Sequence, residues 1–170
     1  MTCLLFVFSC TKESFTNSKD ASISLSADTL HFDTVFTTTG SVTQYFKIKN
    51  ENNQKLLFSN VSLKGGAGSA FKINVNGMIG PEVKDIEVEA NDSIYIFVSV
   101  SINPNIATLP FIVQDSIEIG YNGNKRYVQL ESWGQNANFL RSRLITGRVT
   151  WTNNLPYVIL GGIAPGVVKA

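Results

Sequence analysis

The chain has 170 residues and a formal net charge of +1, with 14 Lys and Arg side chains against 13 Asp and Glu. This balance leaves no basic excess for a phosphate backbone, so we expect no nucleic acid partner. Both cysteines, Cys3 and Cys10, lie at the N-terminus, and the body of the chain therefore offers no disulfide, thiolate metal site or cysteine nucleophile. The length is sufficient for one domain with an ordinary core.

The first ten residues contain a short apolar run, Leu4–Phe8, followed by Cys10 and then by polar sequence. This pattern resembles a bacterial lipoprotein signal, in which residues 1–9 are removed and Cys10 becomes the lipidated first residue. The run is much shorter than the roughly 20 residues that cross a bilayer, and no Lys or Arg precedes it, which indicates a start further upstream. The alternative is an accidental cysteine in a frayed N-terminus. Residues 10–21 are mostly polar and predict a lipidated cysteine followed by a flexible tether.

From residue 22 onwards apolar and polar side chains alternate, which predicts β-strands almost throughout the chain. We expect strands over residues 22–26, 30–36, 42–49, 56–63, 71–75, 83–88, 93–102, 115–121 and 126–133. The pairs Asn76-Gly77 and Asn122-Gly123 tolerate the positive φ angles of tight turns, so each of them predicts a turn.

The strand expected over residues 93–102 has the clearest pattern, because its aliphatic side chains point one way while Tyr95 and Phe97 point the other. Many short strands with one apolar face, and no convincing helix, fit two sheets packed face to face. The expected fold class is all-β: an immunoglobulin-like antiparallel β-sandwich over residues 22–138, with a short lipoprotein leader and an irregular C-terminal tail over residues 139–170. A jelly roll is the alternative fold.

Five segments of the expected sandwich resemble a known family. They are Phe32–Ser41, Phe46–Asn50, Phe71–Gly77, Glu89–Val98 and Trp133–Ala137. Together they look like the N-terminal immunoglobulin-like module of Bacteroidetes-type surface lipoproteins, and like modules of the ASPM/SPD-2/Hydin type. The resemblance covers about residues 22–138. It implies an outer-membrane lipoprotein, periplasmic or surface-exposed, whose Cys10 carries several acyl chains, palmitate among them.

In similar bacterial proteins a right-handed parallel β-helix often follows this module. Residues Gly147–Ile159 look like the entry to such a region. The resemblance therefore implies that residues 139–170 are a linker or the truncated start of a β-helix, and that the chain is a fragment of a larger protein. Alternatively, the tail completes a small local hairpin against the sandwich.

Few residues match the patterns of catalysis or metal binding. His31 is the only histidine, and a catalytic base also needs a nucleophile and an orienting carboxylate, so we interpret His31 as an ordinary strand residue. Gly65–Ser69 precedes a strand rather than a helix, which favours a hairpin connection over a phosphate loop. Asn103–Asn105 matches turn chemistry better than a calcium loop. We expect no catalytic residue, metal ion or cofactor.

The candidate ligand-binding residues are Trp133 and Trp151, since exposed aromatic rings stack on sugars. Packing in the core or between modules competes with this interpretation, because Phe, the aromatic residue typical of cores, supplies 11 of the aromatic side chains against 5 Tyr and 2 Trp.

The expected function is that of a non-enzymatic, membrane-anchored spacer or interaction module of the cell envelope. Its expected partners are the membrane, through the lipid on Cys10, and a protein or glycan at the cell surface. One alternative is a carbohydrate-binding module of a surface glycan-utilisation system. Another is the non-catalytic front of an enzyme whose active region lies downstream.

Overall fold

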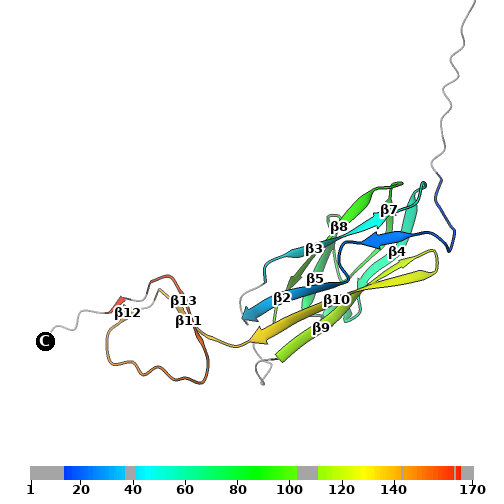
Figure 1. The fold of residues 1–170 in the computed structure, drawn as a ribbon. Helices are drawn as coiled ribbons and strands as arrows, with labels where there is room; N and C mark the ends of the chain where they lie inside the picture. The colour runs from blue at the N-terminus through cyan, green and yellow to red at the C-terminus, as the bar shows by residue number, and fades with distance from the viewer. Residues whose placement is uncertain (1–13, 37–40, 103–110, 143, 163, 166–170) are drawn as a thin grey trace, which may run out of the picture.

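Two five-stranded sheets pack face to face in the computed structural model, which describes residues 14–36, 41–102, 111–142, 144–162 and 164–165 (Figure 1). The first sheet has the order β1 (Ile23–Leu25), β3 (Gln44–Asn50), β8 (Ser93–Val100), β5 (Phe71–Val75) and β6 (Met78–Ile79). The second sheet has the order β2 (Thr29–Phe36), β10 (Asn124–Gln135), β9 (Phe111–Tyr121), β4 (Leu56–Leu63) and β7 (Glu82–Val88). The predicted all-β immunoglobulin-like sandwich is confirmed. Cys10 and Asn103–Asn105 lie outside the described residues.

The core lies between the two sheets and consists of the apolar side of each alternating strand. In β8 the aliphatic side chains are buried while Tyr95 and Phe97 face outward, as predicted. Burying an aliphatic or Phe side chain contributes about 1.5–3 kcal/mol, so packing can hold a sandwich whose body has no cysteine. The largest fully buried side chains come from both sheets and include Phe46, Ile48, Leu56, Phe58, Ile96, Ile117 and Ile119.

Two Asn-Gly pairs close tight hairpins where the sequence predicts turns. Asn76 and Gly77 have φ angles of 48° and 92° and join β5 to β6, while Asn122 and Gly123 have φ angles of 45° and 78° and join β9 to β10. Gly and Asn adopt this left-handed region most readily, which explains their presence at both turns. Gly65–Ser69, predicted as a connection between strands, contains the short 3₁₀ turn η1 (Gly66–Gly68) between β4 and β5.

One pairing of the sandwich is parallel, which the alternation alone does not indicate. β2 runs alongside β10 in the same direction, with Leu30 opposite Leu130. β1 pairs instead with β3 in the first sheet. The chain therefore crosses from one sheet to the other over residues 26–28, and this crossing joins the two layers covalently next to their edges.

Residues 14–21, expected to be part of a flexible tether, lie against the sandwich. Thr16 is buried, and its backbone N–H donates a 2.8 Å hydrogen bond to the carbonyl of Lys55. The side-chain amide of Asn122 donates to the carbonyl oxygens of Thr16 and Ser18, both at 2.9 Å. The structure differs from the tether prediction over this stretch, because a turn distant in sequence supplies the partners that its backbone groups require.

Four short strands lie in the described part of the tail: β11 (Asn138–Arg141), β12 (Leu144–Ile145), β13 (Tyr157–Leu160) and β14 (Ala164–Pro165). β11 pairs with β13, and β12 pairs with β14, both in parallel. A local hairpin is antiparallel, so this alternative for the tail is wrong. The ring of Phe139 meets the ring of Phe36 edge-on, with centroids 6.2 Å apart, where the tail leaves the end of β10 (Figure 1).

Candidate functional site

The two tryptophans predicted as ligand-binding residues lie in different parts of the chain. Trp133 is on β10, is 46% exposed on the outer face of the second sheet, and has Ile112 as its cross-strand neighbour. Trp151 is 44% exposed and belongs to the segment between β12 and β13. Neither ring is part of the core. Of the two, Trp151 lines a hollow, which makes the tail the first candidate site.

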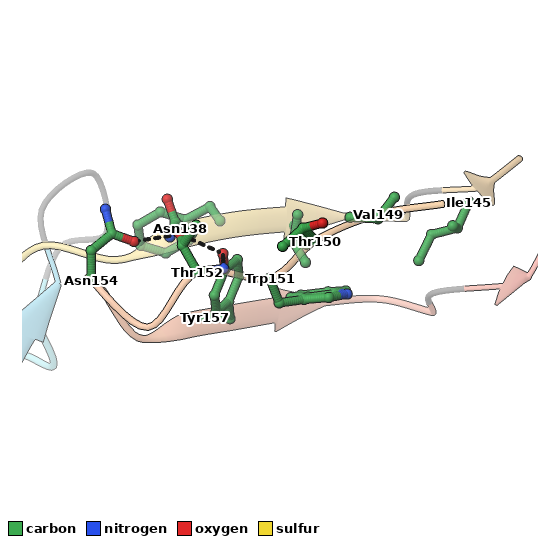
Figure 2. Close-up of a pocket in the computed structure, with 10 residues that line it drawn as sticks. Asn138, Ile145, Val149, Thr150, Trp151, Thr152, Asn154 and Tyr157 are labelled. Atoms are coloured by element: carbon green, nitrogen blue, oxygen red, sulfur yellow. Dashed lines mark hydrogen bonds between the residues drawn. The ribbon is translucent and has the colours of Figure 1, made fainter. Parts of the chain in front are cut away.

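The hollow in the tail has a volume of about 330 Å³ and is lined by residues of β11, β12, β13 and the segment that connects β12 to β13 (Figure 2). The ring of Trp151 meets that of Tyr157 edge-on, with centroids 4.7 Å apart. The backbone N–H of Thr152 donates to the Tyr157 hydroxyl at 3.0 Å, and the Thr152 hydroxyl donates to Asn154 Oδ1 at 2.6 Å. Figure 2 shows Thr152, Asn154 and Tyr157 together at one end of the hollow, with Ile145 and Val149 at the other end. Much of this polar and aromatic lining therefore holds the segment itself in place.

Three exposed aromatic rings gather at a second place, on the outer face of the first sheet. Tyr45 on β3 lies directly opposite Phe97 on β8, and Tyr95 shares the outer face with Phe97. The ring centroids are 5.6 Å apart for Tyr45 and Tyr95, and 6.0 Å apart for each of the other two pairs. The exposed fractions of Tyr45, Tyr95 and Phe97 are 55%, 39% and 42%. We call these three residues the aromatic triad.

Lys47 extends the triad along β3. It lies opposite Tyr95, and its Nζ is 4.9 Å from the centre of the Tyr95 ring, within the range at which an ammonium is attracted to an aromatic face. Hydrogen bonding and electrostatic interaction with Tyr95 raise the pKa of Lys47 above its ordinary value. Lys47 therefore presents a positive charge beside the triad throughout the physiological pH range.

The two sheets differ in charge, because the charged side chains of the first sheet are all basic and those of the second are mostly acidic. The five strands of the first sheet contain Lys47, Lys49 and Lys72 and have no Asp or Glu. The second sheet is rich in acidic side chains, which are Asp33, Glu82, Asp85, Glu87, Asp115, Glu118 and Glu131. The outer face of the first sheet is consequently basic and aromatic, and any ligand that it attracts is expected to be anionic.

Glu118 lies on the outer face of the second sheet, where three side chains donate hydrogen bonds to it. Lys125 Nζ donates to Oε1 at 2.9 Å, and the Tyr127 hydroxyl and Lys64 Nζ donate to Oε2 at 3.0 and 3.3 Å. These contacts, led by the one from Lys125, lower the pKa of Glu118 to about 2. A carboxylate with so low a pKa is a poor general acid or base at neutral pH, so we interpret Glu118 as a structural group that joins β9, β10 and the end of β4.

Within the described ranges, no group of three or more His, Cys, Asp or Glu side chains is arranged to hold a metal ion. His31 is exposed on β2, with its Nδ1 3.7 Å from the Glu131 carboxylate, which fits its interpretation as an ordinary strand residue. In the same part of the chain, no helix has the length and apolar character needed to cross a membrane.

No family model matches the chain, and no curated protein matches it. Among solved structures, a family 123 glycoside hydrolase from Clostridium perfringens is similar, with 12% identity and a TM-score of 0.49. This match covers 69% of the present chain and 30% of the hydrolase chain, so the present chain corresponds to less than a third of that enzyme.

Two further solved structures are similar to the chain. The PapD-like (ASH) domain 7 of human CEP192 has 10% identity and a TM-score of 0.41, and the match covers 80% of this chain and 96% of that one. A chain from the complex of the Salmonella enterica SafA pilin with the SafB chaperone has 14% identity and a TM-score of 0.41, and the match covers 69% of this chain and 55% of that one. These likenesses concern the fold alone.

Proposed function

We propose that the chain is the membrane-anchored front part of a cell-envelope lipoprotein, and that its sandwich is a non-enzymatic spacer for a following parallel β-region. A spacer requires an attachment at one end, a rigid body, and a second region attached at the other end. The observation that carries the proposal is the parallel pairing within the tail, which begins directly after the last strand of the sandwich.

The tail has the spacing of one coil of a β-solenoid. Asn138 lies opposite Tyr157, an offset of 19 residues, and Leu144 lies opposite Ala164, an offset of 20 residues. Two successive parallel ladders with nearly the same offset are expected when each coil of the chain stacks on the one before. Strands at the open side of such a coil present unpaired backbone groups, which a further coil would pair. This spacing supports a following right-handed parallel β-helix, as the resemblance implies.

The two attachment points lie at opposite ends of the sandwich (Figure 1). At one end, the β9–β10 turn binds the N-terminal segment, since Asn122 donates to Thr16 and Asn124 donates to the carbonyl of Lys19 at 2.8 Å. From that turn β10 runs for 12 residues to Gln135, beyond which the tail begins. At about 3.3 Å per residue this strand spans about 40 Å, which is the separation that the spacer would provide.

The tether available for anchoring is short. Residues 14–21 lie against the sandwich, so only the four residues from Cys10 to Glu13 separate the lipidation position from the described chain. Even fully extended, four residues span only about 14 Å. So short a tether would hold the β9–β10 end of the sandwich close to the membrane. Stable anchoring there requires more than one acyl chain, because a single myristoyl chain binds only with K of about 10⁴ M⁻¹.

Metabolic labelling with a clickable fatty acid tests the anchor. We expect label on the chain expressed in a bacterium that processes lipoproteins, and no label on Cys10→Ser. Cys3→Ser is the matched control and should remain labelled, because Cys3 belongs to the part removed. A second form with two lysines inserted after Met1 supplies the basic residues that the leader lacks. Label that persists in Cys10→Ser would refute the anchor. Absence of label from both the wild type and the form with inserted lysines would refute it as well.

Energy transfer to acceptor lipids tests the spacer geometry. The processed protein has no cysteine other than the lipidated Cys10, so single fluorophores can be attached at Lys19→Cys, near the β9–β10 turn, and at Thr146→Cys in the tail. We expect strong transfer from the first position and weaker transfer from the second. Equal transfer from both positions would contradict an upright spacer.

A further inference from the structure

The outer face of the first sheet carries side chains that a spacer does not need. Two rings of the aromatic triad belong to a row that crosses four strands, because Tyr45, Phe97, Asn74 and Ile79 lie in register on β3, β8, β5 and β6. Ile79 is 83% exposed, so the row ends in another apolar group open to solvent. Exposed aromatic and aliphatic side chains gathered on one face, here with the polar Asn74 among them, commonly mark a binding site.

The core does not require the triad. Phe46, Ile96 and Val98, the inward neighbours of its rings, are themselves fully buried and fill the space between the sheets. Cross-strand aromatic pairs do stabilise a sheet, by about 0.2–1 kcal/mol for each pair. That contribution comes from contacts between the rings and leaves 39–55% of each side chain exposed to solvent.

Shallow hollows flank the triad on both sides. One, of about 300 Å³, is lined by Phe97 together with Lys72 and Asn74. The other, of about 250 Å³, is lined by residues that include Lys47 and Lys49. Each hollow is close to the lower end of the size range of ordinary ligand sites. The triad thus lies between two hollows, each with a basic side chain in its wall.

Charge favours an anionic occupant over another copy of this face. Lys49 is neutralised by Glu51 at 2.7 Å. In the described part of the chain, Lys47 and Lys72 have no such carboxylate partner. Two copies of the sheet placed face to face would bring these ammonium groups together, which is unfavourable. An acidic ligand would pair with them.

We propose that this face binds an acidic glycan, a polysaccharide that carries uronate carboxylates. The rings of Tyr95 and Phe97 are stacked, with planes 15° apart, and both side chains are partly exposed, so each offers part of its aromatic surface to a sugar ring. The C–H bonds on the face of a sugar ring carry partial positive charge and stack on the negative face of an aromatic ring. Lys47 and Lys72, one in each hollow, pair with the carboxylates through charge-assisted hydrogen bonds, and the Asn74 side chain reaches sugar hydroxyls.

Affinity electrophoresis of the full chain carrying Cys10→Ser tests this proposal. We expect gels containing polygalacturonate or alginate to retard the protein and gels containing dextran or starch not to do so. Tyr45→Thr and Phe97→Thr keep strand propensity and should each weaken binding about tenfold, as measured by calorimetry. The double variant Lys47→Gln with Lys72→Gln should weaken binding at least as much and remove most of its salt dependence.

Ile112→Thr is the matched control, because Ile112 is 48% exposed on a strand of the other sheet; it should bind like the wild type, with thermal unfolding as the check that each variant is folded. The proposal is overturned if neither acidic polymer binds, if neutral polymers bind equally well, or if Phe97→Thr binds like the wild type. It is also overturned if sedimentation shows self-association that Tyr45→Thr abolishes, because a second copy would then occupy the face. The unlipidated protein is used throughout, so the result does not depend on the anchor.

Discussion

Replacing Asn50 by alanine is expected to destabilise the sandwich substantially. Asn50 ends β3 and is fully buried, and its side-chain amide donates to the carbonyl oxygens of Gln54, Glu89 and Val88 at 2.8, 2.9 and 3.2 Å. Its Oδ1 accepts a hydrogen bond from the backbone N–H of Asn52 at 3.0 Å. This one side chain therefore joins the turn between β3 and β4 to the end of β7.

The magnitude follows from the groups that lose a partner. Asn50→Ala removes two amide hydrogens and one acceptor, each worth a net of about 0.5–1.5 kcal/mol in a folded protein, and it leaves buried carbonyls unpaired. The expected loss in the free energy of unfolding is about 3 kcal/mol. For a chain of this size, 1 kcal/mol corresponds to about 2–4 °C. The melting temperature should therefore fall by about 6–12 °C.

Thermal and urea unfolding of the wild type, Asn50→Ala and Asn53→Ala measure this effect. Asn53 lies in the same turn but is exposed, and its side-chain oxygen accepts a single long hydrogen bond of 3.4 Å from Asn91. Its replacement should change the free energy of unfolding by no more than about 0.5 kcal/mol. If Asn50→Ala melts within about 2 °C of the wild type, the reasoning from buried hydrogen bonds is refuted.

Three further variants address the acid response, the tail and the N-terminal segment. The folded pKa of Glu118, about 2, lies below the ordinary value of 4.5, so its stabilising contribution is complete above about pH 4.5 and is lost as the pH falls towards 2. Glu118→Gln should therefore lower the urea midpoint at neutral pH by a gap that closes with acidification, and a gap constant down to pH 2.5 would contradict this. Phe139→Ala removes the contact with Phe36 and should increase proteolysis of the tail without changing the melting of the sandwich; unchanged proteolysis would count against that contact. Asn122→Gly keeps the turn conformation but loses both hydrogen bonds to the N-terminal segment. Hydrogen exchange at the Thr16 amide should therefore accelerate. An exchange rate equal to that of the wild type would show that these bonds do not hold the segment.

The alternation of side chains predicts which face of a strand is buried, but not which strand lies beside it. It correctly assigned the two faces of β8, and the Asn-Gly pairs correctly located two turns. The parallel pairing of β2 with β10 was not foreseen, since Leu30 and Leu130 are a hundred residues apart and either strand fits any partner with the same pattern. Likewise, the polar composition of residues 14–21 gives no sign that Asn122 binds them.

The aromatic triad was missed for the same reason. Alternation alone places Tyr45, Tyr95 and Phe97 outward on their strands. It does not show that Tyr45 lies opposite Phe97, because that depends on the register between β3 and β8. Residue type drew attention to Trp133 and Trp151 instead, which lie on β10 and in the tail. The absence of acidic residues can be seen strand by strand in the sequence, but only the structure shows that the strands without them form one sheet.

The two proposals are compatible because they use different surfaces of the sandwich. The spacer role occupies its two ends, where the N-terminal segment arrives and where the tail departs (Figure 1). The aromatic triad lies on neither end but on the side, since β3 and β8 run lengthwise between them. A four-residue tether of about 14 Å would bring the membrane against the β9–β10 end, and a following region would cover the other. A glycan-binding surface on such a module would therefore have to lie on the outer face of a sheet, and the first sheet is the one whose charge suits an anionic chain.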